Sequence, residues 1–267
     1  MLYLTEEQHL TILENFMGLA RTAKSTPVHS SGLPYTSLMV CFLMHHLAAS
    51  ESLRSLYKSA GPDWFPRTVG FAIVRPMFEI DVTAHFISQQ PIERAQRFID
   101  FHDVLRYNHM LAVKQHRSSS KPSWNESLNF LWEQEYAENE SQIVENFERV
   151  KMSFMQEGQN RKTKAIRNWS GLTLKEMARA VDHVEAYDVF YSDLSSYTHA
   201  DVHLADSFLK IGDSDRSWSM KAHEGDFAFV VQYALSFFEC FLTLFGSQFN
   251  TWKPSDVSAC WALPGSN

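Results

Sequence analysis

The chain has 267 residues, of which 45% are apolar and 13% aromatic, and this content can fill a packed core, which excludes a disordered protein. The net charge is −7 and the basic residues are spread out except at 161–167, so the charge gives no support to a broad nucleic-acid-binding surface and does not exclude a small RNA-cutting pocket. Cys41, Cys240 and Cys260 lack the spacing of a zinc motif or a disulfide framework, and this cysteine usage predicts a reducing, cytoplasmic compartment.

Apolar residues recur at intervals of three and four along most of the chain, and this periodicity predicts helices. Thr5 and Gln8 form a capping box at the start of the first helix. Pro76 lies inside the third helix and predicts a kink or a restart there, whereas Pro91 suits the first turn of the fourth. The predicted helices cover residues 6–24, 35–59, 68–89, 92–116, 125–155 (as one long helix or two short ones), 174–181, 184–198 and 226–249.

These elements predict an all-α fold, a single-domain bundle of about seven to eight helices with a short irregular or small β insert near residues 200–220. The domain is expected to cover residues 1–250, with its core at 35–245 and a loose tail at 251–267. The N-terminus carries acidic residues where a signal peptide is basic, and the apolar stretch 37–49 is too short to span a bilayer. We therefore expect a soluble protein with no membrane partner.

The apolar helix at 68–89 carries an ionic pair. Arg75 and Glu79 are four residues apart, which puts both side chains on one face of the helix. Charges among apolar neighbours need partners, because unpaired burial costs several kcal/mol. One interpretation is a structural ion pair that satisfies itself. The other is a guanidinium group that Glu79 fixes in place to bind a phosphate or a carboxylate.

The predicted helix at 184–198 carries polar and aromatic residues at every fourth position, so they form a ridge along one face: Tyr187, Tyr191, Ser195 and His199, with His199 at its C-terminal end. The helix dipole there favours a protonated imidazole, and histidine is the commonest general acid or base near neutral pH. The ridge is interpreted either as a buried set of hydroxyl groups that bond to neighbouring helices, or as part of a site.

His199, Asp201 and His203 are spaced by two, so they would face one side of an extended strand and could bind a metal together with a further carboxylate. Twelve histidines in a chain of this length also produce such triplets by chance. A ferritin-like di-metal site would need two Glu-x-x-His motifs, which the sequence lacks. The sequence therefore predicts no metal ligand and no cofactor, and leaves this triplet as an alternative.

The Arg-x-x-x-Glu helix (Arg75, Glu79), combined with a later helix that ends in Ser-x-x-x-His (Ser195, His199), resembles a bacterial all-helical family known as a domain of unknown function of the five-six-seven-seven type. The resemblance covers residues 35–245, and Trp169 resembles the tryptophan that often precedes the late helix of that family. Pro76, directly after Arg75, departs from the family pattern. The resemblance implies an all-helical fold and assigns no activity.

The arrangement is also similar to the HEPN superfamily, many of whose members are dimeric, metal-independent ribonucleases of toxin or defence systems. The family hallmark is an arginine four to six residues before a histidine in one helix, and no arginine precedes His199 at that distance. If the chemistry were shared, Arg75 would supply the positive charge from another helix, and His199 would move the proton.

Three functions stay open on these grounds. In the first, the protein binds an anionic ligand or a partner through a pocket of Arg75, Glu79, Ser195 and His199, with Tyr187 and Tyr191 at the ligand. In the second, a HEPN-like ribonuclease uses Arg75 on the phosphate, Glu79 to orient Arg75, His199 as acid or base, and Ser195 or Tyr191 to position RNA. In the third, these groups are purely structural. A homodimer is compatible with all three.

Overall fold

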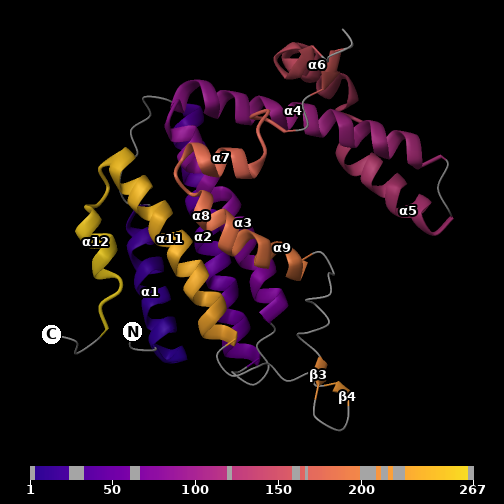
Figure 1. Cartoon of the computed structure of the whole chain (residues 1–267). Helices are drawn as coiled ribbons and strands as arrows, with labels where there is room; N and C mark the ends of the chain where they lie inside the picture. The colour runs from indigo at the N-terminus through magenta and orange to yellow at the C-terminus, as the bar shows by residue number, and fades with distance from the viewer. Residues whose placement is uncertain are drawn as a thin grey trace. The chain divides into compact units, whose positions relative to one another are not determined.

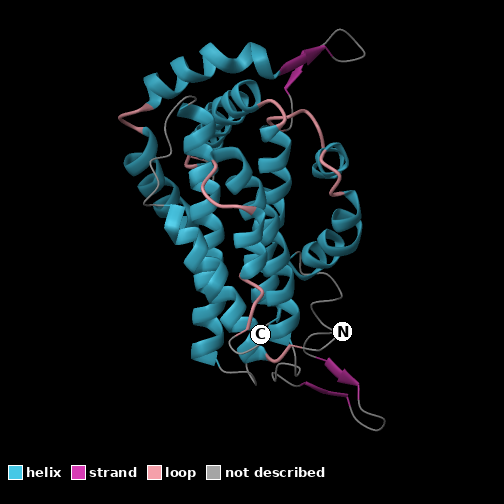
Figure 2. Cartoon of the chain, turned by 90° about the vertical axis from the view of Figure 1, so that its left-hand side faces the viewer, coloured by secondary structure: helices cyan, strands magenta, loops and turns pink. Residues whose placement is uncertain are grey.

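The computed structural model describes residues 4–23, 33–60, 67–118, 122–157, 163–165, 168–198, 209–211, 216–218 and 226–263. Most of these residues are helical, which confirms the all-α fold (Figures 1 and 2). Two antiparallel hairpins are present, β1 (Met155–Glu157) with β2 (Thr163–Ala165), and β3 (Leu209–Ile211) with β4 (Arg216–Trp218). The second hairpin confirms the predicted small β insert near residues 200–220.

The chain divides into two compact units. Unit 1 comprises Met1–Gln89 and Leu174–Asn267, and unit 2 comprises Gln90–Thr173. The first boundary falls directly before Pro91, which occupies the first turn of a new helix, as the sequence predicts. A single domain over residues 1–250 stays a prediction.

Unit 1 is a helical bundle with an aromatic core. Its described helices are α1 (Glu6–Thr22), α2 (Leu33–Ala60), α3 (Arg67–Ser88), α7 (Leu174–Ala180), α8 (Val184–Ala186), α9 (Ser192–Thr198), α11 (Asp226–Phe249) and α12 (Pro254–Ala259), with a π-helical turn at Tyr187–Tyr191. The predicted capping box of α1 is present, because the Gln8 amide donates to the Thr5 hydroxyl (3.2 Å) and the Thr5 amide donates to the Gln8 side chain (2.8 Å).

Helix α11 forms the centre of unit 1, where it packs against α1, α2 and α3 (Figure 1). Its inward side is built from phenylalanines that are almost or fully excluded from water: Phe227, Phe238, Phe241 and Phe245. Burying one such side chain contributes about 2–3 kcal/mol. Among the described helices, α11 is also long and apolar enough to cross a membrane, but most of its apolar stretch is enclosed by the bundle.

One sequence expectation for unit 1 is wrong, and another is narrowed. Helix α3 runs without interruption through Pro76, so the helix does not restart there, and a kink at this residue stays a prediction. The expected loose tail is ordered over residues 251–263, because α12 follows α11 and Trp252 seals the junction. The Trp252 indole donates to the Leu242 carbonyl (2.9 Å) and stacks on Phe245 at 5.6 Å. Those contacts bury Trp252, which polar tail composition alone does not reveal.

Unit 2 contains α4 (Pro91–His116), α5 (Pro122–Leu131), α6 (Glu140–Val150) and the β1–β2 hairpin, with a π-helical turn at Trp132–Tyr136 and a 3₁₀ turn at Lys151–Phe154. The stretch predicted to be helical at 125–155 therefore contains separate helical segments and not one long helix. The core of the unit consists of apolar and aromatic side chains from α4, the π-turn and α6: Met110, Val113, Trp132, Tyr136 and Ile143.

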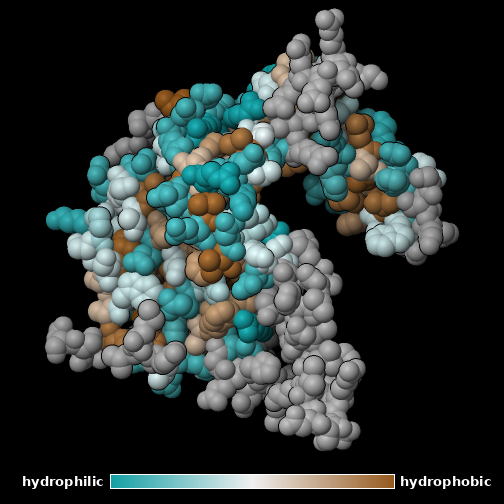
Figure 3. Space-filling view, in the orientation of Figure 1, coloured by the Kyte–Doolittle hydropathy of each residue, from teal (hydrophilic) through white to brown (hydrophobic). Residues whose placement is uncertain are grey.

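Hydrophobic side chains also reach the surface of both units. In unit 2, Trp124 and Phe130 are about two thirds exposed, at 64% and 68%, and in unit 1 Val189 is 59% exposed. Figure 3 shows hydrophobic residues in patches between hydrophilic ones on the visible face. Scattered exposure of this kind is ordinary for folded proteins.

Candidate functional site

Arg75, Glu79 and Tyr191 form a closed hydrogen-bonded triangle in unit 1. Arg75 Nε donates to Glu79 Oε1 at 2.9 Å, and Arg75 Nη2 donates to the Tyr191 hydroxyl at 3.0 Å. That hydroxyl in turn donates to Glu79 Oε1 at 3.1 Å. The predicted pairing of Arg75 with Glu79 is therefore present, and Tyr191 joins it from a segment distant in sequence.

The local geometry of two helices creates this triangle. On α3, four residues separate Arg75 from Glu79, so one turn brings the two side chains together. Tyr191 is the last residue of the π-turn at Tyr187–Tyr191, between α8 and α9. Such turns re-aim side chains relative to a regular helix and recur at functional sites. Leu194 on α9 is fully buried, which anchors this segment in the unit.

The triangle is partly accessible, since the side chain of Arg75 is 21% exposed and that of Glu79 is 39% exposed. Burial acts to lower the pKa of the Arg75 guanidinium, but its bonds to Glu79 and Tyr191 outweigh burial and raise it. Burial and the Glu79 charge raise the pKa of the Tyr191 hydroxyl. The site therefore holds a permanently charged guanidinium beside a protonated phenol.

Tyr187 extends the site along the helix. Its ring stacks on that of Tyr191 with centroids 4.8 Å apart and an angle of 21°. Both rings pack against Phe78 of α3, which is fully buried. The Lys175 ammonium lies 5.6 Å from the centre of the Tyr187 ring and pairs with Asp188 at 2.6 Å. Each ring of the stack thus has a cation near it, since the Arg75 guanidinium carbon lies 5.2 Å from the centre of the Tyr191 ring.

The remaining predicted site residues are only partly described. Ser195 lies on α9 and is partly buried, one turn after Tyr191. His199, Asp201 and His203 lie outside the described residues, and so the predicted role of His199 and the alternative metal triplet stay predictions. Trp169 is buried in unit 2, where its ring meets Phe98 edge to face at 5.2 Å.

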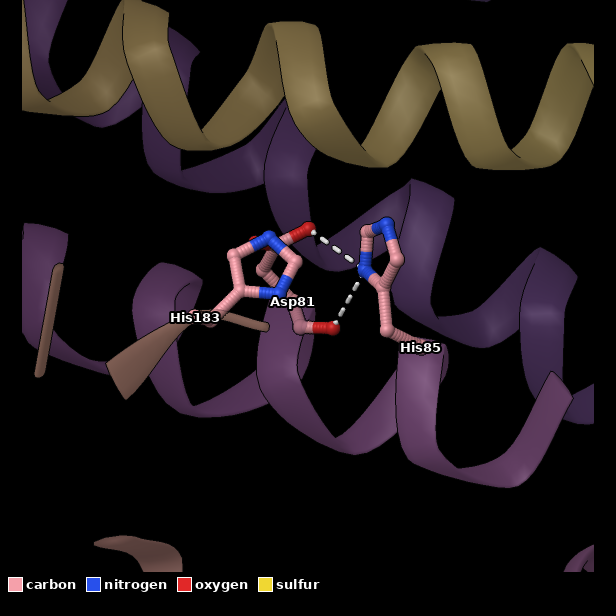
Figure 4. A group of neighbouring side chains, drawn as sticks. All are labelled: Asp81, His85 and His183. Atoms are coloured by element: carbon pink, nitrogen blue, oxygen red, sulfur yellow. Dashed lines mark hydrogen bonds and ion pairs between the residues drawn. The ribbon is translucent and has the colours of Figure 1, made fainter. Parts of the chain in front are cut away.

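A second polar cluster in unit 1 was not singled out by the sequence. Asp81 and His85 of α3 meet His183, which lies in the turn between α7 and α8 (Figure 4). His85 Nδ1 lies 3.2 Å from Asp81 Oδ1, and His183 Nε2 lies 3.7 Å from Asp81 Oδ2. The spacing of four between Asp81 and His85 is readable in the sequence, but the third member comes from a distant segment.

The α7–α8 turn is held firmly in place. The His183 amide donates to the Ala178 carbonyl at 2.7 Å, and the Gln89 side chain donates to the Ala180 carbonyl at 2.8 Å. Asp182 takes a left-handed conformation with φ 62°, which a short polar side chain tolerates better than a bulky one. These bonds fix the position of His183 relative to the end of α3.

Charge and burial interact around Asp81. Burial acts to lower the pKa of His85, but its contacts with Asp81 outweigh burial and raise it. Burial lowers the pKa of His46 on α2 to about 4, against the opposing charge of Asp81. Burial also raises the pKa of the Cys240 thiol on α11 to about 12, and the Asp81 charge acts in the same direction. Asp81 therefore sits where four segments converge.

Comparison with known proteins gives one match. A sequence model described as a family of unknown function (DUF5677) matches residues 38–217, which is about two thirds of the chain. The matched region includes both clusters described above. No curated protein and no solved structure matches the chain.

Proposed function

The chain belongs to the DUF5677 family of unknown function, as its helical motifs predict, and we propose that it binds a small ligand through a phosphate or carboxylate group at Arg75. The observation that carries this proposal is the fixed guanidinium group of Arg75, held by Glu79 and Tyr191 and partly open to solvent. A planar guanidinium group in a fixed orientation suits the oxygen pairs of phosphate and carboxylate.

Pre-organisation favours binding over a purely structural pair. Holding Arg75 before the ligand arrives removes the entropic cost of ordering a long side chain on binding, about 0.5–1.5 kcal/mol. The stacked rings of Tyr187 and Tyr191 place aromatic groups beside the cation. Lys175 adds a second positive charge near the Tyr187 ring, although Asp188 partly neutralises it. A ligand with both an aromatic ring and an anionic group would use all of these features.

The test is a binding series with the full chain. Inorganic phosphate, pyrophosphate, AMP and citrate would be titrated calorimetrically against wild type, Arg75→Gln and Arg21→Gln. Arg21 is a matched control because it lies exposed on α1 and pairs only loosely with Glu51 at 3.4 Å. Losing a charge-assisted hydrogen bond costs about 1.5–3 kcal/mol, so binding by Arg75→Gln should weaken by roughly tenfold to a hundredfold.

Equal binding by Arg75→Gln and wild type, or no binding of any of the four anions, would contradict the proposal. Circular dichroism of each variant separates loss of binding from loss of folding.

A ribonuclease of HEPN type is the second candidate, because the same Arg75 could bind an RNA phosphate. Its test is the integrity of total RNA after expression of wild type beside His199→Ala. RNA fragments with wild type alone would favour cleavage, and intact RNA together with anion binding would favour the binding role.

A further inference from the structure

The carboxylate of Asp81 is buried, and two histidine rings are its close polar neighbours in the cluster. Its side chain is only 1% exposed, and neither oxygen accepts a hydrogen bond from any residue that the structure describes. Burying an ionised carboxylate costs several kcal/mol unless charges and hydrogen bonds satisfy it. The nearest polar atoms of the cluster are the ring nitrogens of His85 and His183, at 3.2 and 3.7 Å. Neither contact has the geometry of a hydrogen bond, so among the described residues the carboxylate meets these two imidazoles only at ion-pair distance.

The three side chains have the spacing of metal ligands. One ligand atom from each of Asp81, His85 and His183 lies within 4.8 Å of the other two. Metal–ligand bonds of about 2.0–2.2 Å at tetrahedral angles put neighbouring ligand atoms about 3.3–3.6 Å apart. The separation of His85 Nδ1 from Asp81 Oδ1, 3.2 Å, and that of His183 Nε2 from Asp81 Oδ2, 3.7 Å, lie close to that range.

The hydrogen bonds of His183 favour metal binding. Its Nδ1 lies 2.9 Å from the Val181 carbonyl and must carry the proton to donate to it. In the neutral ring Nε2 then has the lone pair, and this atom faces Asp81. A backbone carbonyl that fixes the far nitrogen of the ring is the usual support of a metal-binding histidine.

His85 presents its Nδ1 to the same point, as Figure 4 shows. This nitrogen also lies 2.9 Å from the Asp81 backbone carbonyl, to which it donates when it is protonated. A metal ion at Nδ1 would replace that proton, so binding would release it to solvent. Both rings are about one fifth exposed, at 22% and 20%, which leaves a path for an ion to enter.

We propose that Asp81, His85 and His183 form a binding site for a divalent transition-metal ion, with zinc as the best-matched ion. Two imidazoles and one carboxylate are the ligand types that zinc prefers, whereas magnesium and calcium prefer oxygen alone. Three protein ligands leave a coordination position for water or a small molecule. The ion would also join the end of α3 to the α7–α8 turn and neutralise the buried carboxylate.

This site is independent of the anion site. On α3, Asp81 lies two residues after Glu79 and His85 lies six residues after it, and the two clusters share no residue. A metal site could therefore be present whether or not Arg75 binds an anion.

The experiment measures zinc binding by the full chain after removal of any affinity tag and dialysis against EDTA. Wild type should bind one equivalent of Zn²⁺, and Co²⁺ should give the visible absorption bands of a four-coordinate site. The His183→Ala and His85→Ala variants should bind Zn²⁺ roughly a hundredfold more weakly or worse. The matched control is His102→Ala, because His102 is exposed on α4 in unit 2 and should bind like wild type.

Asp81→Asn keeps the size of the buried side chain while removing its charge, so it tests the carboxylate without opening a cavity. If a variant unfolds, the stability of wild type gives a second readout, since zinc should raise its melting temperature in a concentration-dependent way. Mg²⁺ should produce no such shift. No stoichiometric Zn²⁺ binding by wild type, or undiminished binding by His183→Ala, would overturn the proposal.

Discussion

Tyr191 and Arg75 are 116 residues apart in the chain, yet the Tyr191 hydroxyl accepts a hydrogen bond from the Arg75 guanidinium at 3.0 Å. The same hydroxyl donates a hydrogen bond to Glu79. The Tyr191 hydroxyl therefore acts as both donor and acceptor between the two charged side chains. The orientation of Arg75 therefore depends on the π-turn that carries Tyr191 as well as on α3 itself. Removing the Tyr191 hydroxyl should therefore disturb the orientation of Arg75.

Tyr191→Phe removes the hydroxyl and keeps the ring. We expect a loss of about 1–3 kcal/mol in the free energy of unfolding, measured by urea denaturation, because two part-buried hydrogen bonds of about 0.5–1.5 kcal/mol each disappear. A double-mutant cycle with Glu79→Gln should show coupling between the two positions. Tyr187→Phe is the matched control, since among the described residues the Tyr187 hydroxyl makes no hydrogen bond. Equal losses for both tyrosines would argue against the triangle.

Gly246→Ala tests the close packing of α12 on α11. A Cβ atom at Gly246 would lie 2.5 Å from the Trp252 ring, far inside van der Waals contact. Overpacking of this kind costs about 1–3 kcal/mol and should outweigh the gain in helix propensity of about 1 kcal/mol. Gly18→Ala is the control, because no atom lies within 4 Å of the added Cβ, and it should stabilise α1. Thermal unfolding of both variants decides the sign, and a stabilised Gly246→Ala would refute the tight contact.

His46 makes the stability of unit 1 depend on pH. Its ring is fully buried and stacks on Phe238 and Phe241. Burial lowers the pKa of His46 to about 4, and the charge of His45 acts in the same direction. The hydrogen bond to the Phe42 carbonyl and the charge of Asp81 act to raise this pKa, but burial outweighs them. The unfolded chain takes up the proton near pH 6.5, and the folded chain only near pH 4. The contribution of His46 to stability is therefore complete above pH 6.5 and falls between pH 6.5 and 4, by about 3 kcal/mol in total.

The measurement is the urea midpoint of wild type, His46→Gln and His45→Gln across pH 4.5–7.5. The slope below pH 6.5 should become shallower in His46→Gln, because that side chain cannot take up a proton. The His45→Gln variant should keep most of the wild-type slope, since His45 lies at the surface. A slope that is the same in all three proteins would assign the pH dependence to other groups.

The Arg97 guanidinium group on α4 bonds to two other segments of unit 2. Its Nε donates to the Trp169 carbonyl at 2.7 Å, its Nη1 donates to the Ser153 carbonyl at 2.9 Å, and it lies over the Phe154 ring at 4.7 Å. Arg97→Gln should destabilise unit 2 by about 1.5–3 kcal/mol, because two charged hydrogen bonds are lost. Amide hydrogen exchange should report faster opening around Ser153 and Trp169. The control is Arg149→Gln, which removes only exposed ion pairs, and equal effects of the two changes would contradict this role.

The local features of the fold followed from the sequence. The Thr5–Gln8 capping box, the start of α4 at Pro91 and the pairing of Arg75 with Glu79 all depend on residues within one helical turn, so spacing alone predicts them. The small β insert and the family resemblance were also readable from the sequence. The wrong expectation, a loose tail after residue 250, concerns packing between elements, since the partners of Trp252 lie on the preceding helix.

Only the tertiary structure decided which polar groups meet. Tyr191 reaches Arg75, and His183 reaches Asp81 and His85, because α3 packs beside α7 and α9, and no sequence spacing encodes that arrangement. Spacing predicts neighbours within an element, because helical geometry is the same in every protein. Contacts between elements depend on how whole apolar faces fit together. The sequence therefore determined the helices and the pairing of Arg75 with Glu79, while packing decided the contact of Tyr191 with that pair and the Asp81 cluster.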